Sequence, residues 1–232
     1  MKKTVCYCLT RNLYPHIGPS LKSLLKNGNV DEVFLLIEDD GIGAWLPANV
    51  HCMNVRDQGW FRHDGPNYNC GWTWMVMMKT VLSKLFPDSA RMMTIDLDTV
   101  VLGDLSPLWN LDMDRYCVAG AREPHWTQKY GRDYVNCGVL MWNLERMRTG
   151  KDDRLVRMLN KKAYPFVEQD CINEQLVGEI LIMDSAFNSC QWTDPPQSEE
   201  KLIHYAAYGL EAYLHQPIVQ KYAALDWSEV IA

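Results

Sequence analysis

Two aspartates separated by one residue, Asp96 and Asp98, follow the apolar run of residues 92–95. Alternation along an extended strand turns residues i and i+2 to the same side, so both carboxylates face one way. In open α/β sheets, ligands bind at the carboxyl ends of the strands. Two adjacent carboxylates repel each other and favour a cation between them, and oxygen ligands are typical of Mg²⁺, Mn²⁺ or Ca²⁺ sites. The alternative is a pair of aspartates that only cap a turn, but the apolar residues on both sides favour a metal site.

Three further groups could join this site, although each has a purely structural alternative. His204 follows a short apolar run, and an imidazole beside two carboxylates would favour Mn²⁺ over Ca²⁺. A lone histidine is more often a hydrogen-bonded structural residue. The polar segment 168–170 begins a predicted helix, where acids also interact favourably with the helix dipole. Asn136, two residues before Gly138, could equally belong to an ordinary turn.

The elements that must position these groups alternate between strands and helices. The chain begins with a strand–helix–strand pattern, which indicates an α/β domain with a largely parallel sheet. Strands are predicted at residues 5–9, 33–37, 50–55, 92–95, 116–121, 138–142, 180–183 and 202–204. Helices are predicted at residues 17–25, 72–86, 155–159 and 171–177, and residues 57–71 read as a loop.

Length, composition and charge narrow the class of protein. The chain has 232 residues, 47% of them hydrophobic and 22% charged, which suits a globular domain. The net charge of −6 argues against non-specific nucleic-acid binding, which depends on basic surface. A phosphate-bearing substrate would therefore need a local positive group, such as a metal ion.

The cysteines and the N-terminus bear on the compartment. Eight cysteines are scattered, mostly within apolar runs, without a C-x-x-C pair that would indicate a structural zinc site. Unpaired use of cysteine is typical of a reducing compartment. The basic N-terminus is followed by too short an apolar stretch for a signal peptide, and no run is long enough to span a membrane. We therefore expect a cytoplasmic protein without a transmembrane segment.

The order and spacing of the motifs resemble glycosyltransferase family 8, the group that includes glycogenin and the lipopolysaccharide galactosyltransferases. Residues 93–109, MTIDLDTVVLGDLSPLW, are similar to the family signature in full. Shorter matches are CLTRNLY at 8–14, NCGVLM at 136–141, EQDCIN at 168–173, Asn188, and IHY at 203–205. The resemblance covers residues 4–205.

This resemblance implies a GT-A fold, with a Rossmann-like, mixed but mostly parallel sheet flanked by helices. It implies one domain over residues 1–232, with a nucleotide-binding part at about 1–110 and a donor and acceptor part at about 111–232. The implied activity is a retaining hexosyl transfer from a UDP-sugar to a carbohydrate or glycan-bearing acceptor. The implied cofactor is Mn²⁺, with Mg²⁺ as a possible substitute.

The resemblance also assigns roles by position. The ion on the diphosphate would be held by Asp96, Asp98 and His204. The nucleotide would be bound by Leu9, Thr10, Asn12, Tyr14 and the segment Asp96, Leu97 and Asp98. Lys79 would contact the donor or its phosphates, and the donor sugar would be surrounded by Asn136, Glu168, Gln169 and Asp170. These roles suit the chemistry, because a divalent ion stabilises a departing diphosphate and nearby oxygens stabilise an oxocarbenium-like sugar.

Two positions depart from the family pattern. Leu210 stands where the family has a phosphate-binding lysine, and Glu168 stands where it has aspartate. The first departure leaves open a degenerate member that binds sugar nucleotide or glycan without turnover, or another basic residue in the lost role, namely Arg11, Lys129 or Lys221.

A haloacid-dehalogenase-like phosphatase is a remote alternative for an Asp-x-Asp motif. That class carries the motif near the N-terminus, with threonine two residues beyond the second aspartate. Here Thr99 directly follows Asp98, and the pair lies well inside the chain.

Aromatic residues gather around the long loop, at Trp60, Phe61, Tyr68, Trp72 and Trp74, and Trp126 lies in a second loop. Aromatic faces can pack on sugar rings, or they can anchor a loop to the core. We expect Trp72 and Trp74 to be anchors, because both fall on the predicted helix 72–86. For Trp60 and Trp126, both roles remain open.

Overall fold

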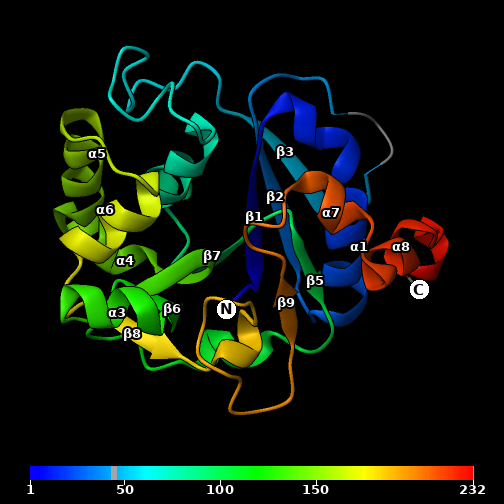
Figure 1. Cartoon of the computed structure of the whole chain (residues 1–232). Coiled ribbons are helices and arrows are strands. Elements are labelled where there is room, and N and C mark those ends of the chain that lie inside the picture. Colours follow the sequence, from blue (N-terminus) through cyan, green and yellow to red (C-terminus); the bar gives the residue numbers. More distant parts are fainter. Residues whose placement is uncertain (43–45, 232) are drawn as a thin grey trace.

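The computed structural model describes residues 1–42 and 46–231, which are built around one seven-stranded sheet and one two-stranded sheet (Figure 1). The larger sheet has the order β3-β2-β1-β4-β7-β6-β8. Its strands are β1 (Thr4–Leu9), β2 (Glu32–Ile37), β3 (Val50–Asn54), β4 (Arg91–Ile95), β6 (Val118–Arg122), β7 (Val135–Asn143) and β8 (Ile180–Met183). The smaller sheet pairs β5 (Thr99–Val101) with β9 (Leu202–His204).

The larger sheet is mixed but mostly parallel. Strand β7 is antiparallel to both of its neighbours, β4 and β6, while the remaining neighbouring pairs are parallel. Because β7 runs against β4, the first residues of β7 lie beside the carboxyl end of β4. This reversal brings two segments that are far apart in the sequence to one edge of the sheet.

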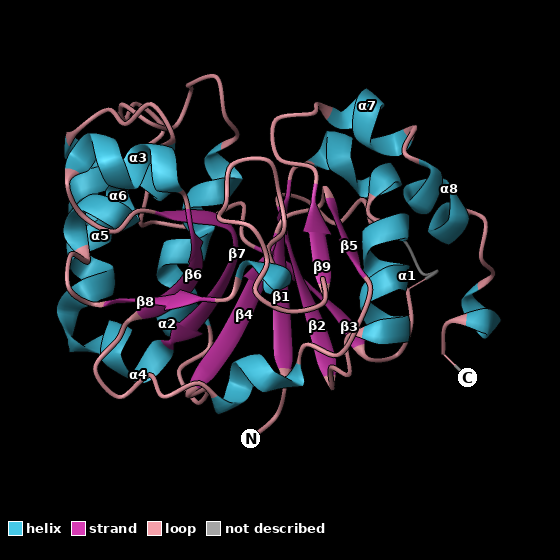
Figure 2. Cartoon of the chain, turned by 60° about the horizontal axis from the view of Figure 1, so that its bottom comes forward, coloured by secondary structure: helices cyan, strands magenta, loops and turns pink. Residues whose placement is uncertain are grey.

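Helices cover both faces of the sheet (Figures 1 and 2). The helices are α1 (Gly18–Asn27), α2 (Leu82–Leu85), α3 (Pro124–Tyr130), α4 (Leu144–Arg146), α5 (Asp152–Lys161), α6 (Val167–Gln175), α7 (Leu210–Leu214) and α8 (Pro217–Ala223). Side chains of β1 alternate between the faces, as a strand requires. Val5, Tyr7 and Leu9 join the core under α1 and α8, while Cys6 joins the core under α5 and α6. No helix among the described residues has the length and apolar character that crossing a membrane would require.

The predicted α/β fold is confirmed, and each predicted strand is present to within a few residues of its predicted ends. The predicted long helix over residues 72–86 is wrong. A 3₁₀ helix, Trp74–Val81, is followed by the short α2, and the backbone leaves helical geometry at Val81 (φ −114°, ψ 13°). Every side chain from Met77 to Val81 is buried, so packing on all sides, rather than one amphipathic face, sets this segment's geometry.

Candidate active site

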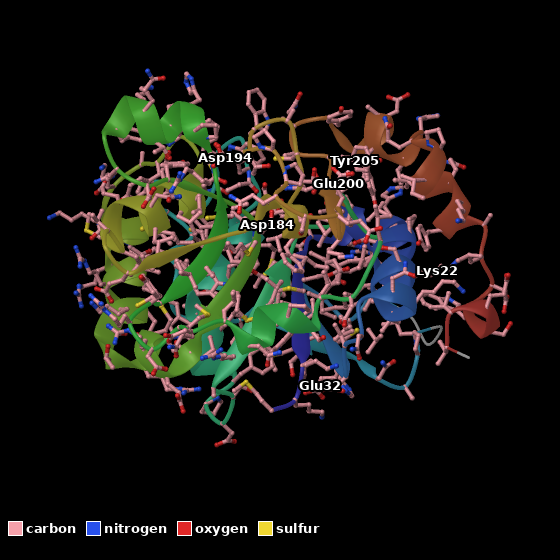
Figure 3. All side chains as sticks on the ribbon, turned by 90° about the horizontal axis from the view of Figure 1, so that it is seen from below. Lys22, Glu32, Asp184, Asp194, Glu200 and Tyr205 are labelled. Carbon is pink, nitrogen blue, oxygen red and sulfur yellow. The ribbon has the colours of Figure 1, made fainter. Side chains whose placement is uncertain are left out.

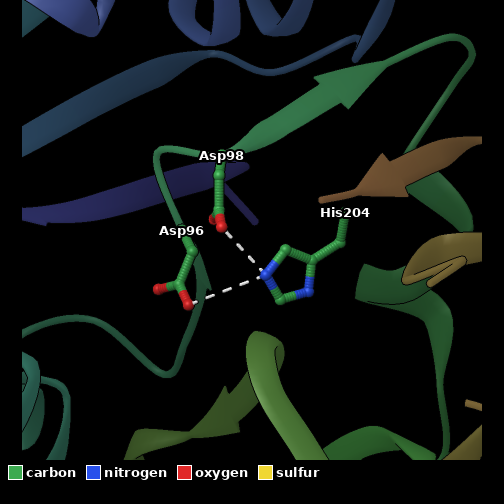
Figure 4. Close-up of side chains that lie close together, drawn as sticks. All are labelled: Asp96, Asp98 and His204. Atoms are coloured by element: carbon green, nitrogen blue, oxygen red, sulfur yellow. Dashed lines mark ion pairs between the residues drawn. The ribbon is translucent and has the colours of Figure 1, made fainter. Parts of the chain in front are cut away.

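Asp96, Asp98 and His204 form a compact cluster at the carboxyl edge of β4 (Figure 4). Their candidate ligand atoms all lie within 4.8 Å of one another. His204 Nε2 is 3.3 Å from an Asp98 carboxylate oxygen and 4.0 Å from an Asp96 oxygen. Two carboxylate oxygens and one imidazole nitrogen on one side of a centre, open on the other, suit a divalent cation that still has room for ligand oxygens.

Backbone pairing, rather than side-chain packing alone, brings these three residues together. The turn that carries both aspartates connects β4 to β5, and β9 pairs with β5 so that His204 lies opposite Thr99. Tyr205 N also donates to the carbonyl of Asp98 at 2.8 Å, and Asp96 N donates to the carbonyl of Gly138 at 2.8 Å. Main-chain hydrogen bonds therefore hold the backbone at all three residues of the cluster.

Electrostatics in the cluster favour positive charge. Burial lowers the pKa of His204, but the carboxylate of Asp98, then a hydrogen bond with Cys190 and then the carboxylate of Asp96 more than offset this and raise the pKa to about 10. The negative potential that stabilises the protonated imidazole would also attract a metal ion. Binding a metal would require the ion to take the place of the Nε2 proton.

Gly138 is required by the histidine that packs on it. A Cβ atom added at Gly138 would lie 2.0 Å from His204 Cε1 and within 2.8 Å of both ring nitrogens. Side-chain atoms cannot approach so closely, so the imidazole would have to move. The Asn-x-Gly motif at 136–138 is therefore no ordinary turn: it lies in β7 and makes room for the imidazole.

Lys79 lies behind the carboxylates and does not line the cleft. It is 2% exposed, and its ammonium is 2.7 Å from Asp96 Oδ1, 3.2 Å from Glu168 Oε1 and 3.0 Å from the carbonyl of Cys137. Burial lowers the pKa of Lys79, but Asp96 and Glu168 outweigh that effect and raise it above its ordinary value. The family resemblance implies that Lys79 contacts the donor or its phosphates, whereas in the structure its ammonium orients two carboxylates.

A cleft of about 320 Å³ opens beside the cluster. Its lining includes six predicted site residues: Asp96, Asp98, Asn136, Glu168, Gln169 and His204. The other lining residues are Trp72, Val76, Glu123, His125, Trp126, Cys137, Gly138, Phe166, Trp192, Ala206 and Ala207. Predicted site residues that do not line it are Leu9, Thr10, Asn12, Tyr14, Lys79, Leu97 and Asp170.

The polar segment at the start of α6 is held in a specific orientation. Gln169 Oε1 accepts from the backbone N–H of Cys137 at 2.9 Å. This bond fixes the orientation of the Gln169 amide beside the cleft. Asp170 instead accepts from Tyr134 OH at 2.7 Å and from the N–H of Phe166 at 2.9 Å. Val167, directly before this segment, has φ +39°, a strained conformation for a β-branched residue. Burial raises the pKa of Glu168, an effect that Lys79 partly offsets.

The predicted nucleotide loop follows β1 at the same edge of the sheet as the cluster, because β1 and β4 are parallel neighbours. Thr10 Oγ1 donates to Asn12 Oδ1 at 2.6 Å. Thr10 is partly exposed, and Asn12 is exposed. Tyr14 is buried, and its hydroxyl accepts from the backbone N–H of Glu38 at 2.9 Å. Leu9 and Leu97 are also buried. Tyr14 thus anchors the loop, while Thr10 and Asn12 remain accessible.

Sequence reasoning missed Glu123, His125 and Trp192, all of which line the cleft. A signal for Glu123 existed, since an acid that directly follows the buried strand β6 lies at the edge where β4 also ends. Trp192 lies in an irregular segment, where no periodicity reveals its direction. The expectation that Trp72 is a buried anchor is wrong: it is 51% exposed and lines the cleft. Trp74, by contrast, stacks on Tyr68 as a loop anchor does.

A mixed sheet flanked by helices, with an Asp-x-Asp and histidine cluster beside a cleft, defines the GT-A class of sugar-transferring folds. The glycosyl transferase family 8 model matches residues 4–208, and the chain belongs to this family. A protein of Haemophilus influenzae named "Putative glycosyltransferase" is 25% identical over 120 residues, which cover 46% of this chain and 36% of that protein.

Solved structures share the fold. The galactosyltransferase LgtC, in complex with donor and acceptor sugar analogues, is 17% identical with a TM-score of 0.70, covering 97% of this chain and 98% of that one. The glycosyltransferase GlyE of Streptococcus pneumoniae TIGR4 is 17% identical with a TM-score of 0.73, covering 100% of this chain and 62% of that one. Because the chain belongs to this family, the Asp-x-Asp motif is not that of a haloacid-dehalogenase-like phosphatase.

Replacing Gly138 by alanine is expected to weaken the binding of a divalent cation at this cluster by roughly tenfold or more, the range found when the surroundings of a metal ligand are disturbed. The reason is that the new methyl group displaces the His204 ring. Isothermal titration with Mn²⁺ measures the effect. Gly18→Ala serves as the matched control, because nothing lies within 4 Å of a Cβ added there. Unchanged Mn²⁺ affinity in folded Gly138→Ala would contradict this account of the motif.

Replacing Lys79 by methionine is expected to reduce the free energy of unfolding by about 3–5 kcal/mol, because it leaves the buried carboxylate of Glu168, and the partly exposed one of Asp96, without their cation. Denaturant unfolding measures the change. Lys162→Met removes a surface ion pair with Glu174 and should cost less than about 1 kcal/mol. Similar losses in the two variants would show that Lys79 does not hold the carboxylates in place.

Proposed function

We propose that this protein is a retaining hexosyltransferase that uses a UDP-sugar donor and Mn²⁺ and transfers the sugar to a carbohydrate acceptor. The observation that carries the proposal is that the cluster of Asp96, Asp98 and His204 lines the same cleft as Asn136 and Gln169. A cation-binding cluster that shares one cavity with amide and carboxylate oxygens suits a charged diphosphate next to a sugar.

Mn²⁺ would be held by Asp96, Asp98 and His204, and Mg²⁺ could take the same oxygens. When bound, the ion stabilises the negative charge of the leaving diphosphate. The mixed oxygen and nitrogen ligand set favours Mn²⁺ over Ca²⁺. The nucleotide would extend from this ion across the carboxyl ends of the neighbouring parallel strands β4 and β1 to Thr10 and Asn12, whose side chains are accessible just after β1.

The donor sugar would lie against Asn136, Glu168 and Gln169, all of which line the cleft. Their oxygens suit an oxocarbenium-like sugar, whose positive charge gains from nearby dipoles and carboxylates. Lys79 holds Glu168 and Asp96 in position from behind, and Asp170 fixes the start of α6 through Tyr134. Retention of configuration is supported by the family resemblance.

The acceptor would be an uncharged sugar. Trp72 and Trp192 are 51% and 48% exposed on the cleft rim, and Trp126 lines it between Phe166 and Tyr134. Exposed aromatic faces pack well against the C–H faces of sugar rings. Four carboxylates line the cleft, and none of the described lining residues is lysine or arginine, which disfavours an anionic acceptor.

A degenerate member that binds without turnover is the second candidate, and Leu210 is the observation that favours it. Leu210 begins α7, packs against the hydrophobic core and offers no charge to a diphosphate. Assays of binding and of turnover separate the two candidates, because only the transferase releases UDP in the presence of a UDP-sugar.

UDP and Mn²⁺ are expected to bind together, with UDP affinity falling at least tenfold when the ion is removed, since few other positive groups face the diphosphate. Calorimetry with and without Mn²⁺ measures this dependence. Asp98→Ala should abolish the Mn²⁺-dependent part and the slow hydrolysis of UDP-glucose or UDP-galactose, while the thermal unfolding midpoint stays near that of the unchanged protein. Metal-independent UDP binding, or hydrolysis retained by Asp98→Ala, would contradict the proposed function.

Trp192→Ala is expected to raise the acceptor KM about five- to tenfold with little change in donor binding, because one stacked ring contributes roughly 1 kcal/mol. Trp227→Ala removes a tryptophan in the C-terminal segment instead and should leave the acceptor KM unchanged. A glycan array with UDP-sugar and Mn²⁺ identifies the acceptor, and transfer mainly to sialylated or phosphorylated glycans would refute the neutral class.

A further inference from the structure

A buried line of hydrogen bonds joins His204 to Glu123, which also lines the cleft. His204 Nδ1 is 3.0 Å from Asn188 Oδ1, and Asn188 Nδ2 is 3.0 Å from Asn136 Oδ1. Asn136 Nδ2 is in turn 2.7 Å from Glu123 Oε1. All four side chains are at least nine-tenths buried, so water does not readily replace these contacts.

One backbone group fixes the direction of the whole line. The N–H of Gly138 donates to Asn136 Oδ1 at 2.9 Å, so this atom of the amide must be the oxygen. An oxygen cannot donate, and Asn188 must therefore present its NH₂ group to Asn136 and its oxygen to the imidazole. It follows that His204 donates from Nδ1, since an amide oxygen only accepts.

The consequence is a histidine with a defined tautomer. With one proton on Nδ1, Nε2 is the ring nitrogen that points at Asp96 and Asp98, where a metal ion would take the place of its proton (Figure 4). Every donor in the line points toward Glu123, so a negative charge there polarises the two amides in one direction. A carboxylate that accepts from a metal-binding histidine makes the imidazole a stronger ligand, and two intervening amides extend its reach.

Glu123 also controls the sugar-facing wall. Its Oε1 accepts from Gln169 Nε2 at 3.4 Å, in addition to Asn136. The orientation of Gln169 is again set by a backbone donor, the N–H of Cys137 on Gln169 Oε1. One carboxylate therefore holds the amides of two cleft-lining residues, and through Asn136 it reaches the metal cluster.

We propose that Glu123 is a positioning residue that, through Asn136 and Asn188, fixes His204 as an Nε2 metal ligand and couples the metal cluster to the wall that carries Gln169. This inference rests on the proposed function in one respect, namely that a divalent ion binds at Asp96, Asp98 and His204. It assigns no contact between Glu123 and the ion.

Glu123→Gln is the sharpest test, because glutamine keeps the shape and can still accept from Asn136 while the charge is lost. We expect Mn²⁺ affinity, measured by calorimetry without sugar donor, to fall about tenfold, as for other outer-shell partners of metal ligands. Glu32→Gln is the matched control, since Glu32 opens β2 at the far end of the parallel strands. Figure 3 shows it well away from Tyr205, the neighbour of His204. The control should bind Mn²⁺ as the unchanged protein does.

A second measurement uses the unchanged protein and does not depend on the folding of any variant. In protein loaded with diamagnetic Zn²⁺, ¹⁵N histidine NMR should find the His204 proton on Nδ1, protected from exchange with water. Coordination through Nδ1, or Mn²⁺ affinity of Glu123→Gln equal to that of the control, would overturn the inference. Failure of the unchanged protein to bind any divalent ion would instead refute the proposed function.

Discussion

Carboxylates crowd the carboxyl edge of the larger sheet, where mutual repulsion and loss of hydration both oppose them. The ion pair of Lys79 with Asp96 and Glu168 relieves most of this cost, because a single buried ammonium serves two acids at 2.7 and 3.2 Å. Among the described residues, no lysine or arginine forms an ion pair with Glu123. Burial raises the pKa of Glu123, and hydrogen bonds from Asn136 and Gln169 offset part of the rise. Asp98, and Asp96 despite its bond to Lys79, are partly exposed on the cleft side, where an ion can reach them.

The topology of the sheet explains why these partners can meet. β7 is antiparallel to β4, with Ile95 paired to Val139, so Asn136 and Gly138 lie beside the turn that carries both aspartates. β9 adds His204 from the opposite direction by pairing with β5. Lys79, on the 3₁₀ helix Trp74–Val81, connects α6 to this part of the sheet, because it bonds both to Glu168 on α6 and to the carbonyl of Cys137 on β7.

The sequence predicts the strands and the metal cluster because both depend on local pattern. An apolar run followed by Asp-x-Asp identifies β4 and its edge, and the family resemblance adds His204, Asn136 and Gln169, which the structure brings to the same cleft. The part that the sequence does not predict depends on contacts over long separations. The role of Lys79 is set by Glu168, 89 residues away, and that of Asn136 by Asn188, 52 residues away. Trp72 and Trp192 reach the cleft from irregular segments whose direction no periodicity encodes.

Leu210 has a different meaning once the charges of the cleft are known. A lysine at this position would begin α7, whereas the leucine packs against the core and the described residues that line the cleft include no lysine or arginine. Lys79, the lysine that is buried among the described residues, already pairs with Asp96 and Glu168. In the proposed function, the diphosphate must then rely on the bound ion to a greater extent than in relatives with that lysine. The strength of His204 as a ligand, and hence the line of amides that orients it, would bear directly on donor binding.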